Sequence, residues 1–264
     1  MDERTAENIN ILGRFCGVRD VTALTPEELE KACGTARADV MVLFGGSVLC
    51  GGDVLAEAMR AMAAERYMIV GGEGHTTQAL RDRVHAEFPD IETAGLPEAD
   101  VLSAYLRRVY GLRPDHTERR STNCGNNITN MLAMLEENGV HARSIILCQD
   151  ATMQRRMAAG LRKYAPEGLD IISFAAYSAE VVYSGGALHY AWYIHGMWDI
   201  PRYVELLMGE IPRLTDDAQG YGPKGRGFIA HVDIPDEVHC AHEALKREFG
   251  DITRPANPLY AAAR

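Results

Sequence analysis

The sequence lacks the marks of a secreted or membrane-spanning chain. None of its six cysteines forms a C-x-x-C pair and their spacing is irregular, so we expect reduced thiols rather than a disulfide framework. No run of about 18 apolar residues occurs, which excludes a transmembrane helix. The charged start Met1-Asp2-Glu3-Arg4 does not have the pattern of a signal peptide. We therefore expect a cytoplasmic protein without a membrane partner.

An excess of basic residues is also missing. Lysine and arginine number 27 against 37 aspartates and glutamates, which gives a formal net charge of −10. Such a chain repels a phosphate backbone, so we expect no nucleic-acid partner. A local basic pocket for one small anion is compatible with this balance. The 264 residues are 47% hydrophobic, which is enough to bury a sizeable core.

Several common catalytic signatures are absent as well. The glycine-rich turns match neither the G-x-G-x-x-G pattern of dinucleotide-binding folds nor the P-loop, and no G-x-S-x-G elbow occurs. His239 and His242 lie three residues apart, and His231 and Asp233 form a bare H-x-D. Neither pair has the full ligand set of a zinc site, so we expect no dedicated metal site.

Apolar runs alternate with helical patterns along the first two thirds of the chain. Runs over 39–44, 67–70, 144–149 and 169–174 have the pattern of strands buried on both faces, and amphipathic segments lie between them. This alternation predicts an α/β fold with a mostly parallel sheet and helices on both sides. We assign residues 1–180 to this ligand-binding core and residues 181–264 to a mainly helical extension packed on it.

The extension is expected to contain two helices and one long loop. A helix begins near Asp199 and is expected to end at Gly209, because glycine often follows a helix end. A polar, glycine-rich loop follows over 215–228, and a last helix is expected over 236–249. The loop is either a segment that closes on a ligand or a static connector.

Glycine-rich turns follow two of the predicted strands. The first turn holds Gly45, Gly46 and Ser47, and the second holds Gly71, Gly72 and Gly74. Ligands of parallel α/β sheets bind outside the carboxyl ends of the strands, and glycine lets the backbone approach them closely. His75, next in the second turn, can act as an acid or base near neutral pH. Ordinary turns explain the same residues equally well.

A polar segment before another predicted helix is a candidate anion site. Ser121, Thr122 and Asn123 offer hydroxyls and an amide beside the free backbone N–H groups of the first turn, which can hold a phosphate or a carboxylate. Asn127 adds a second amide to this segment. Simple capping of the helix is the alternative.

Charged residues at two other element ends complete the candidate site. Asp150 is expected at the carboxyl end of the strand 144–149, and Gln154 and Arg155 fall in the first turns of the following helix. An arginine there can fork onto a carboxylate or phosphate, although a helix cap and a surface arginine pair explain the same residues. Glu98 opens the helix 98–110, a position that the helix dipole also favours.

Taken in order along the chain, these motifs resemble the SanA/ElyC/YdcF family, long described as a domain of unknown function, and most closely its YdcF branch. The shared strings are Ser121-Thr122-Asn123-Cys124-Gly125, Thr152-Met153-Gln154-Arg155-Arg156 and Gly220-Tyr221-Gly222-Pro223-Lys224-Gly225-Arg226. The resemblance covers most of the chain and implies a Rossmann-like three-layer α/β/α core that binds S-adenosyl-L-methionine. One departure is Asn126, which stands where the family usually has a glutamate.

Three functional hypotheses follow. The first is an enzyme, a transferase or hydrolase acting on S-adenosylmethionine or a related nucleotide-like molecule, with His75 as acid or base. Helix starts and Arg155 would then hold the ligand's carboxylate, and Glu98 or Asp150 would face its cationic end. The second is a non-catalytic binding or sensing module for the same ligand. The third is a phosphate-ester hydrolase or transferase that uses the same anion pocket.

Overall fold

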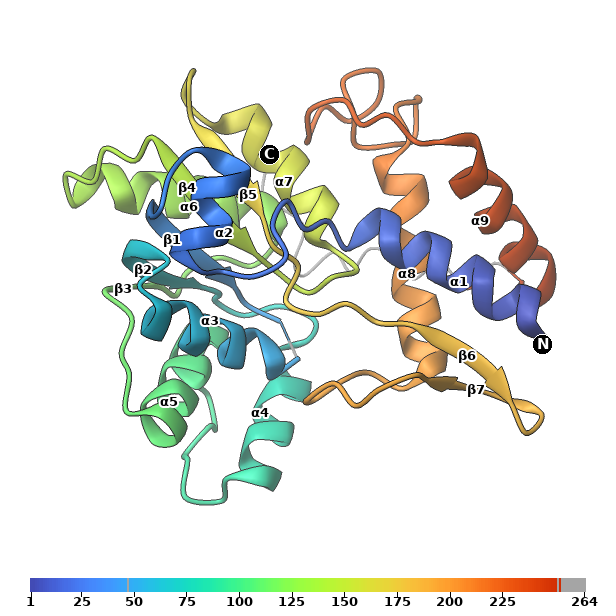
Figure 1. Ribbon diagram of the computed structural model, residues 1–264, viewed down its shortest axis with the longest axis horizontal. Coiled ribbons are helices and arrows are strands. Elements are labelled where there is room, and N and C mark those ends of the chain that lie inside the picture. The colour runs from blue at the N-terminus through green and yellow to red at the C-terminus, as the bar shows by residue number, and fades with distance from the viewer. Residues whose placement is uncertain (47, 251, 253–264) are drawn as a thin grey trace.

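The computed structural model describes residues 1–46, 48–250 and 252, and a five-stranded parallel sheet forms its centre (Figure 1). The strands are β1 (Ala38–Phe44), β2 (Ala64–Val70), β3 (His116–Glu118), β4 (Ser144–Cys148) and β5 (Asp170–Ser173). They lie in the order β3-β2-β1-β4-β5 and all pairs are parallel. This confirms the predicted α/β class and the Rossmann-like core.

The two central strands are apolar because both faces of the sheet are covered. In β1, Val40 and Val42 pack into one core cluster, whereas Met41 and Leu43 pack into the other. β4 is buried at every residue. The edge strand β3 was not predicted from the sequence, because its three residues His-Thr-Glu lack an apolar run.

Helices cover the two faces as separate layers. α6 (Cys124–Glu137) and α7 (Gln154–Tyr164) supply the apolar side chains of one cluster, and α3 (Cys50–Ala61) and α5 (Glu98–Tyr110) contribute to the other. Figure 1 shows these pairs on opposite sides of the sheet. α4 (Thr77–Glu87) packs against α5, and the short α2 is Pro26–Cys33.

The C-terminal elements lie beside the sheet and are joined there by the first helix (Figure 1). They are the hairpin β6 (Val181–Ser184) and β7 (Ala187–Tyr190), α8 (Ile200–Leu214) and α9 (Asp236–Phe249). α1 (Glu3–Cys16) packs against α8, α9 and β6. The predicted boundary at residue 180 therefore separates α1 from its packing partners, and the hairpin was missed in the mainly helical extension.

α8 corrects the expectation that a helix ends at Gly209. The helix continues to Leu214, so Gly209 lies inside it. The Arg213 guanidinium occupies the space that a Cβ at position 209 would take. Pro212 also lies inside the helix and has no N–H for the carbonyl of Met208. The Nε2 of buried His242 donates to that carbonyl at 3.2 Å. The lost backbone hydrogen bond is thus replaced from α9.

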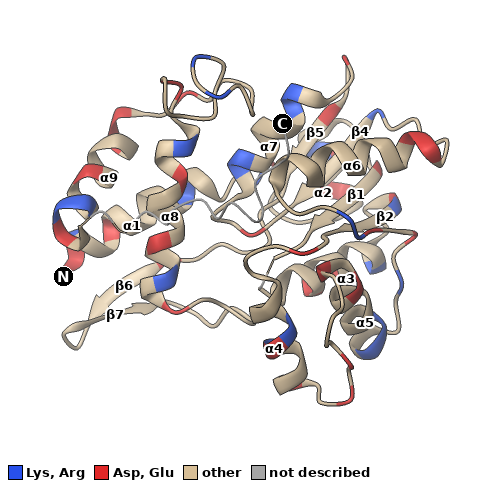
Figure 2. Ribbon diagram, turned by 180° about the vertical axis from the view of Figure 1, so that it is seen from behind, with Lys and Arg blue, Asp and Glu red and all other residues tan. Residues whose placement is uncertain are grey.

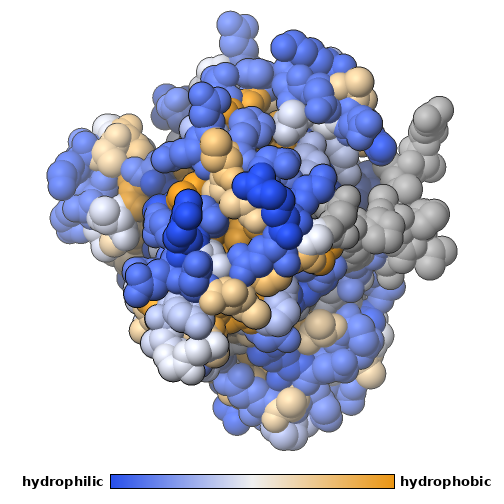
Figure 3. Space-filling view, turned by 90° about the vertical axis from the view of Figure 1, so that its right-hand side faces the viewer, coloured by the Kyte–Doolittle hydropathy of each residue, from blue (hydrophilic) through white to orange (hydrophobic). Residues whose placement is uncertain are grey.

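The surface carries charges of both signs, as expected from the 27 basic and 37 acidic residues (Figure 2). Figure 2 shows basic and acidic residues interspersed along α8 and α9 and only basic ones on α7, and Figure 3 shows a mainly hydrophilic face with apolar residues between. All six cysteines are free thiols. Among the described residues, no helix combines the length and apolar character needed to cross a bilayer.

Candidate functional site

A cavity of about 1120 Å³ opens at the carboxyl edge of the sheet. One side is formed by the turns after β1, β2 and β4 and by the start of α6, and the other by α7, α8 and residues 221–229. The cavity lies between β1 and β4, where the order in which the chain adds strands to the sheet reverses. Ligands of open α/β sheets bind at this switch point.

Most of the residues predicted from separate turns meet in this cavity. Those that line it are Gly45, Gly46, Gly72, Gly74, His75, Glu98, Ser121, Thr122, Asn123, Asn127 and Asp150. Gly71 lies directly behind them, against Glu98 and the Cα of Gly45. Ser47 lies outside the described residues.

Arg155 and Gln154 do not line the cavity, which corrects their prediction. Successive helix residues point about 100° apart, so only one arginine of the 155–156 pair can face it, and that residue is Arg156. Arg155 instead stacks on the Phe15 ring at 4.2 Å and donates to the carbonyl of Phe15. Gln154 closes the end of β4, where it accepts from the N–H of Gln149 and donates to Leu147 O, both at 2.9 Å.

Glu98 is a buried carboxyl at the start of α5. The hydroxyls of Thr77 and Thr76 donate to its Oε1 at 2.9 and 3.2 Å. Burial raises the pKa of Glu98, and these two hydrogen bonds oppose that shift only in part. A Cβ at Gly45 or at Gly71 would lie 3.0 Å from the Glu98 Cβ, so both turns need glycine to make room for this side chain.

Asp150 lines the cavity, and both of its carboxylate oxygens are engaged by protein donors. Its carboxylate accepts from Thr152 N–H at 2.9 Å, Thr152 Oγ1 at 2.7 Å, Tyr177 OH at 2.8 Å and Trp198 Nε1 at 2.9 Å. A carboxylate offers about four acceptor sites. Asp150 therefore anchors two later segments of the chain to the end of β4.

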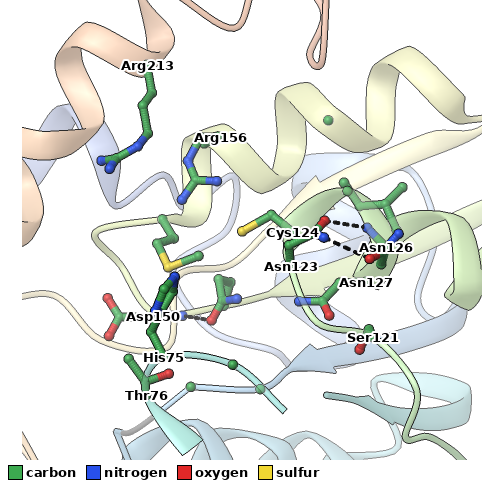
Figure 4. Close-up of a pocket in the computed structure, with 18 of the residues that line it drawn as sticks. His75, Thr76, Ser121, Asn123, Cys124, Asn126, Asn127, Asp150, Arg156 and Arg213 are labelled. Carbon is green, nitrogen blue, oxygen red and sulfur yellow. Dashed lines mark hydrogen bonds between the residues drawn. The ribbon is translucent and has the colours of Figure 1, made fainter. Parts of the chain in front are cut away.

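The start of α6 is capped, and the cap involves the side chains of Asn123 and Asn126. Asn123 accepts from the N–H of Asn126 at 3.0 Å and donates to the Asn126 side-chain oxygen at 2.8 Å (Figure 4). Thr122 Oγ1 donates to the same oxygen at 3.2 Å. Ser121 joins this segment to the second turn, since its Oγ accepts from Gly72 N–H at 3.0 Å.

The opposite wall contains a buried ion pair that the sequence did not predict. Arg156 Nη2 lies 2.9 Å from Glu210 Oε1, and the two side chains are only 11% and 5% exposed. Arg213 Nη1 lies 3.7 Å from the same oxygen, so two guanidinium groups face one carboxylate. Figure 4 shows Arg156 reaching toward the sulfur of Cys124. Burial alone lowers the pKa of Arg156, but Cys124 and Glu210 raise it well above its ordinary value.

Other lining residues from the C-terminal part were also missed. They are Trp198, Arg202, Glu205, Tyr221, Arg226 and Phe228. The paired arginines at 155–156 and the string Gly220–Arg226 were visible signals. The pairing of Arg156 with Glu210 was not, because 54 residues separate them.

Metal ligation finds no support in the described part of the chain, where no group of three or more His, Cys, Asp or Glu residues is placed to hold an ion. No protein-family model matches this sequence.

Proposed function

We propose that this chain is a SanA/ElyC/YdcF-like protein that binds S-adenosylmethionine or a related nucleotide-like small molecule and acts on it as a transferase or hydrolase. The observation that supports this is the single cavity lined by the β1, β2 and β4 turns and by the start of α6. Its volume of about 1120 Å³ is at the upper end of small-molecule sites.

The charges along the cavity suit a ligand that carries both signs. Glu98 and Asp150 lie at the sheet edge, and Arg156 and Arg213 outnumber Glu210 on the opposite wall. S-adenosylmethionine has a carboxylate at one point and an ammonium and a sulfonium nearby. In this arrangement the carboxylate of the ligand faces the arginine wall, which is formed by Arg156 and Arg213. Arg156 thus takes the ligand-binding role that was predicted for Arg155.

Glu98 is the strongest candidate for proton transfer. A buried carboxyl with a raised pKa in a cleft is typical of general acids and bases. His75 lies exposed at the rim of the cavity, and its role as acid or base stays part of the proposal.

Two measurements test the proposed ligand. Mass spectrometry of small molecules released from freshly purified, denatured protein should detect S-adenosylmethionine or a related nucleoside. Calorimetric titration with S-adenosylmethionine should give saturable heat, and product analysis after long incubation should detect turnover that His75→Ala or Glu98→Gln reduces. Absence of both a released nucleoside and saturable binding would refute the proposal.

Binding without chemistry is the second candidate, and one observation favours it. The carboxylates of Asp150 and Glu210 are already engaged by protein donors, so they hold the cavity in shape rather than react. Saturable binding with the ligand recovered unchanged would favour this function.

Phosphate-ester chemistry is favoured by a different feature, the excess of guanidinium groups beside the start of α6. A screen of phosphomonoesters with and without divalent metal tests it. Phosphate release in neither arm would remove this candidate.

A further inference from the structure

Gln149 is a cavity residue whose amide nitrogen has no partner among the described residues. It follows β4, is 1% exposed, and lines the cavity at the switch point between β1 and β4. Its Oε1 accepts from the N–H of Asp150 at 2.6 Å, but its buried Nε2 makes no hydrogen bond within the part of the chain that the structure describes. Buried polar groups are rarely left unpaired in folded proteins.

The surroundings of this nitrogen favour a ligand over a trapped water. The small void on the other side of Gln149 has a volume of about 10 Å³ and is lined mainly by apolar side chains. A buried water normally makes two to four hydrogen bonds, and the one carboxylate in this lining, that of Asp150, is already engaged by protein donors. Gln149 also lines the large cavity.

The charge near Gln149 selects the kind of group that it can bind. A Cβ at Gly46 would lie 3.4 Å from Gln149 Oε1, and a Cβ at Gly45 would lie against Glu98, so the glycine turn separates the two side chains. Asp150 follows directly in the chain. Glu98 and Asp150 line the same edge of the cavity as Gln149, and two carboxyl groups there disfavour a third anion. The anionic part of a ligand is better placed at the arginine wall on α7 and α8.

We propose that Gln149 Nε2 donates to an uncharged hydrogen-bond acceptor of the ligand, such as a ring nitrogen, a hydroxyl or a carbonyl oxygen, while the anionic group of that ligand lies at Arg156 and Arg213. This inference deepens the proposed function and rests on its cavity, but not on S-adenosylmethionine as the ligand. The class of ligand is therefore a nucleoside-like molecule that joins an uncharged polar end to an anionic end.

The test compares an uncharged probe with an anionic one. Adenosine and adenosine monophosphate are titrated into the wild-type protein, Gln149→Met and Arg213→Gln, with Gln78→Met on the exposed face of α4 as control. We expect Gln149→Met to weaken both probes roughly tenfold, because a hydrogen bond to a buried donor is lost. Arg213→Gln should weaken adenosine monophosphate by a similar factor and adenosine by less than about twofold.

Either of two results would overturn the proposed role of Gln149. Equal binding of adenosine by wild type and Gln149→Met overturns it, as does equal weakening of the two probes by Arg213→Gln. Gln149→Glu, which keeps the acceptor for the Asp150 amide, gives the same test if Gln149→Met unfolds at a lower temperature. S-adenosylmethionine is titrated in parallel. If it does not bind while the adenosine probes follow the expected pattern, the named ligand of the proposed function fails and the role of Gln149 stands.

Discussion

Glu98 and Asp150 border the same cavity, yet their surroundings give them different properties. Glu98 has two hydroxyl donors on one oxygen and a raised pKa caused by burial. Asp150 has donors on both oxygens from three residues that lie 2, 27 and 48 positions away. Residue type alone does not distinguish these two carboxyl groups, because burial and the number of fixed hydrogen-bond donors differ between them.

Replacement of Glu98 by glutamine should change how stability depends on pH. The folded protein holds the Glu98 proton more tightly than the unfolded chain does, because its folded pKa is raised. The cost of ionising it is absent below the ordinary glutamate pKa and appears as pH rises through the raised value. Glu98→Gln should therefore unfold at the same temperature as wild type near pH 4 and at a higher temperature near pH 8.

Thermal unfolding across this pH range checks the expectation. Glu65→Gln is the control, because Glu65 is an exposed carboxyl on β2. A Glu98→Gln variant that is less stable than wild type at pH 8 would contradict the assignment of Glu98 as a buried carboxyl with a raised pKa.

At the scale of elements, α7 and α8 are joined by the pair of Arg156 and Glu210. Removing Arg156 leaves the buried Glu210 carboxylate with only the more distant guanidinium of Arg213, whereas removing both Arg156 and Glu210 leaves a packed apolar contact. We expect Arg156→Met to lower the free energy of unfolding by about 3 to 5 kcal/mol. The double variant Arg156→Met with Glu210→Met should recover most of this loss, measured by chemical denaturation. Additive losses would show that the pair does not act as a unit.

A second link joins α3, α4 and the segment 191–199. His195 Nδ1 lies 2.7 Å from Asp53 and its Nε2 lies 2.9 Å from Glu87. Two carboxylate acceptors suit a doubly protonated imidazole. Burial alone lowers the pKa of His195, but the hydrogen bonds to the two carboxylates outweigh it and raise the pKa. Trp198 in the same segment donates to Asp150, and both residues line the cavity. The link through His195 therefore helps to fix the position of this part of the cavity wall.

Stability from His195 should depend on pH in the same sense as that from Glu98, because the folded state raises both pKa values. A raised histidine pKa stabilises the folded state fully below the unfolded value of about 6.5, and this contribution is lost as pH rises through the folded pKa. The unfolding temperature of His195→Gln should thus fall less than that of wild type between pH 6 and pH 9. Exposed His141, changed to Gln, is the control. Parallel curves for His195→Gln and wild type would rule out the link.

At the scale of the whole molecule, α1 connects the sheet to the C-terminal elements. Asn10 on α1 is buried, donates to Val181 O at 2.9 Å and accepts from Val181 N–H at 2.7 Å. Thr5 donates to Glu248 on α9 at 2.8 Å, and Arg155 on α7 donates to the carbonyl of Phe15. The first helix therefore holds both parts together.

We expect Asn10→Ala to destabilise the entire molecule. It leaves two buried backbone groups of Val181 unpaired, at a cost of about 2 to 6 kcal/mol. Tryptophan fluorescence, which reports on Trp192 and Trp198, and far-ultraviolet circular dichroism should show one coincident transition at lower denaturant. Asn8→Ala, on the half-exposed face of the same helix, should change little. Separate transitions would mean that the two parts unfold independently.

Much of the core could be predicted from the sequence because its signals are local. A strand covered on both faces needs a continuous apolar run, and a ligand-facing turn at its end needs glycine or small polar residues. The runs over 39–44 and 144–149, and the helices that begin at Glu98 and Asp236, were therefore predicted correctly. The turns after β1, β2 and β4 were expected to meet because the carboxyl ends of parallel strands lie at the same edge of a sheet.

The tertiary structure alone decided which polar groups the cavity uses. The sequence by itself determined a parallel α/β core with small and polar residues at one edge, because hydrophobic period and glycine position are properties of neighbouring residues. It left open that Arg156 rather than Arg155 faces the cavity, that Asp150 is engaged by several donors, and that Gln149 Nε2 has no partner in the described ranges 1–46, 48–250 and 252. Helix rotation, ion pairing and hydrogen-bond satisfaction depend on partners tens of residues away, which become neighbours only when the chain is folded.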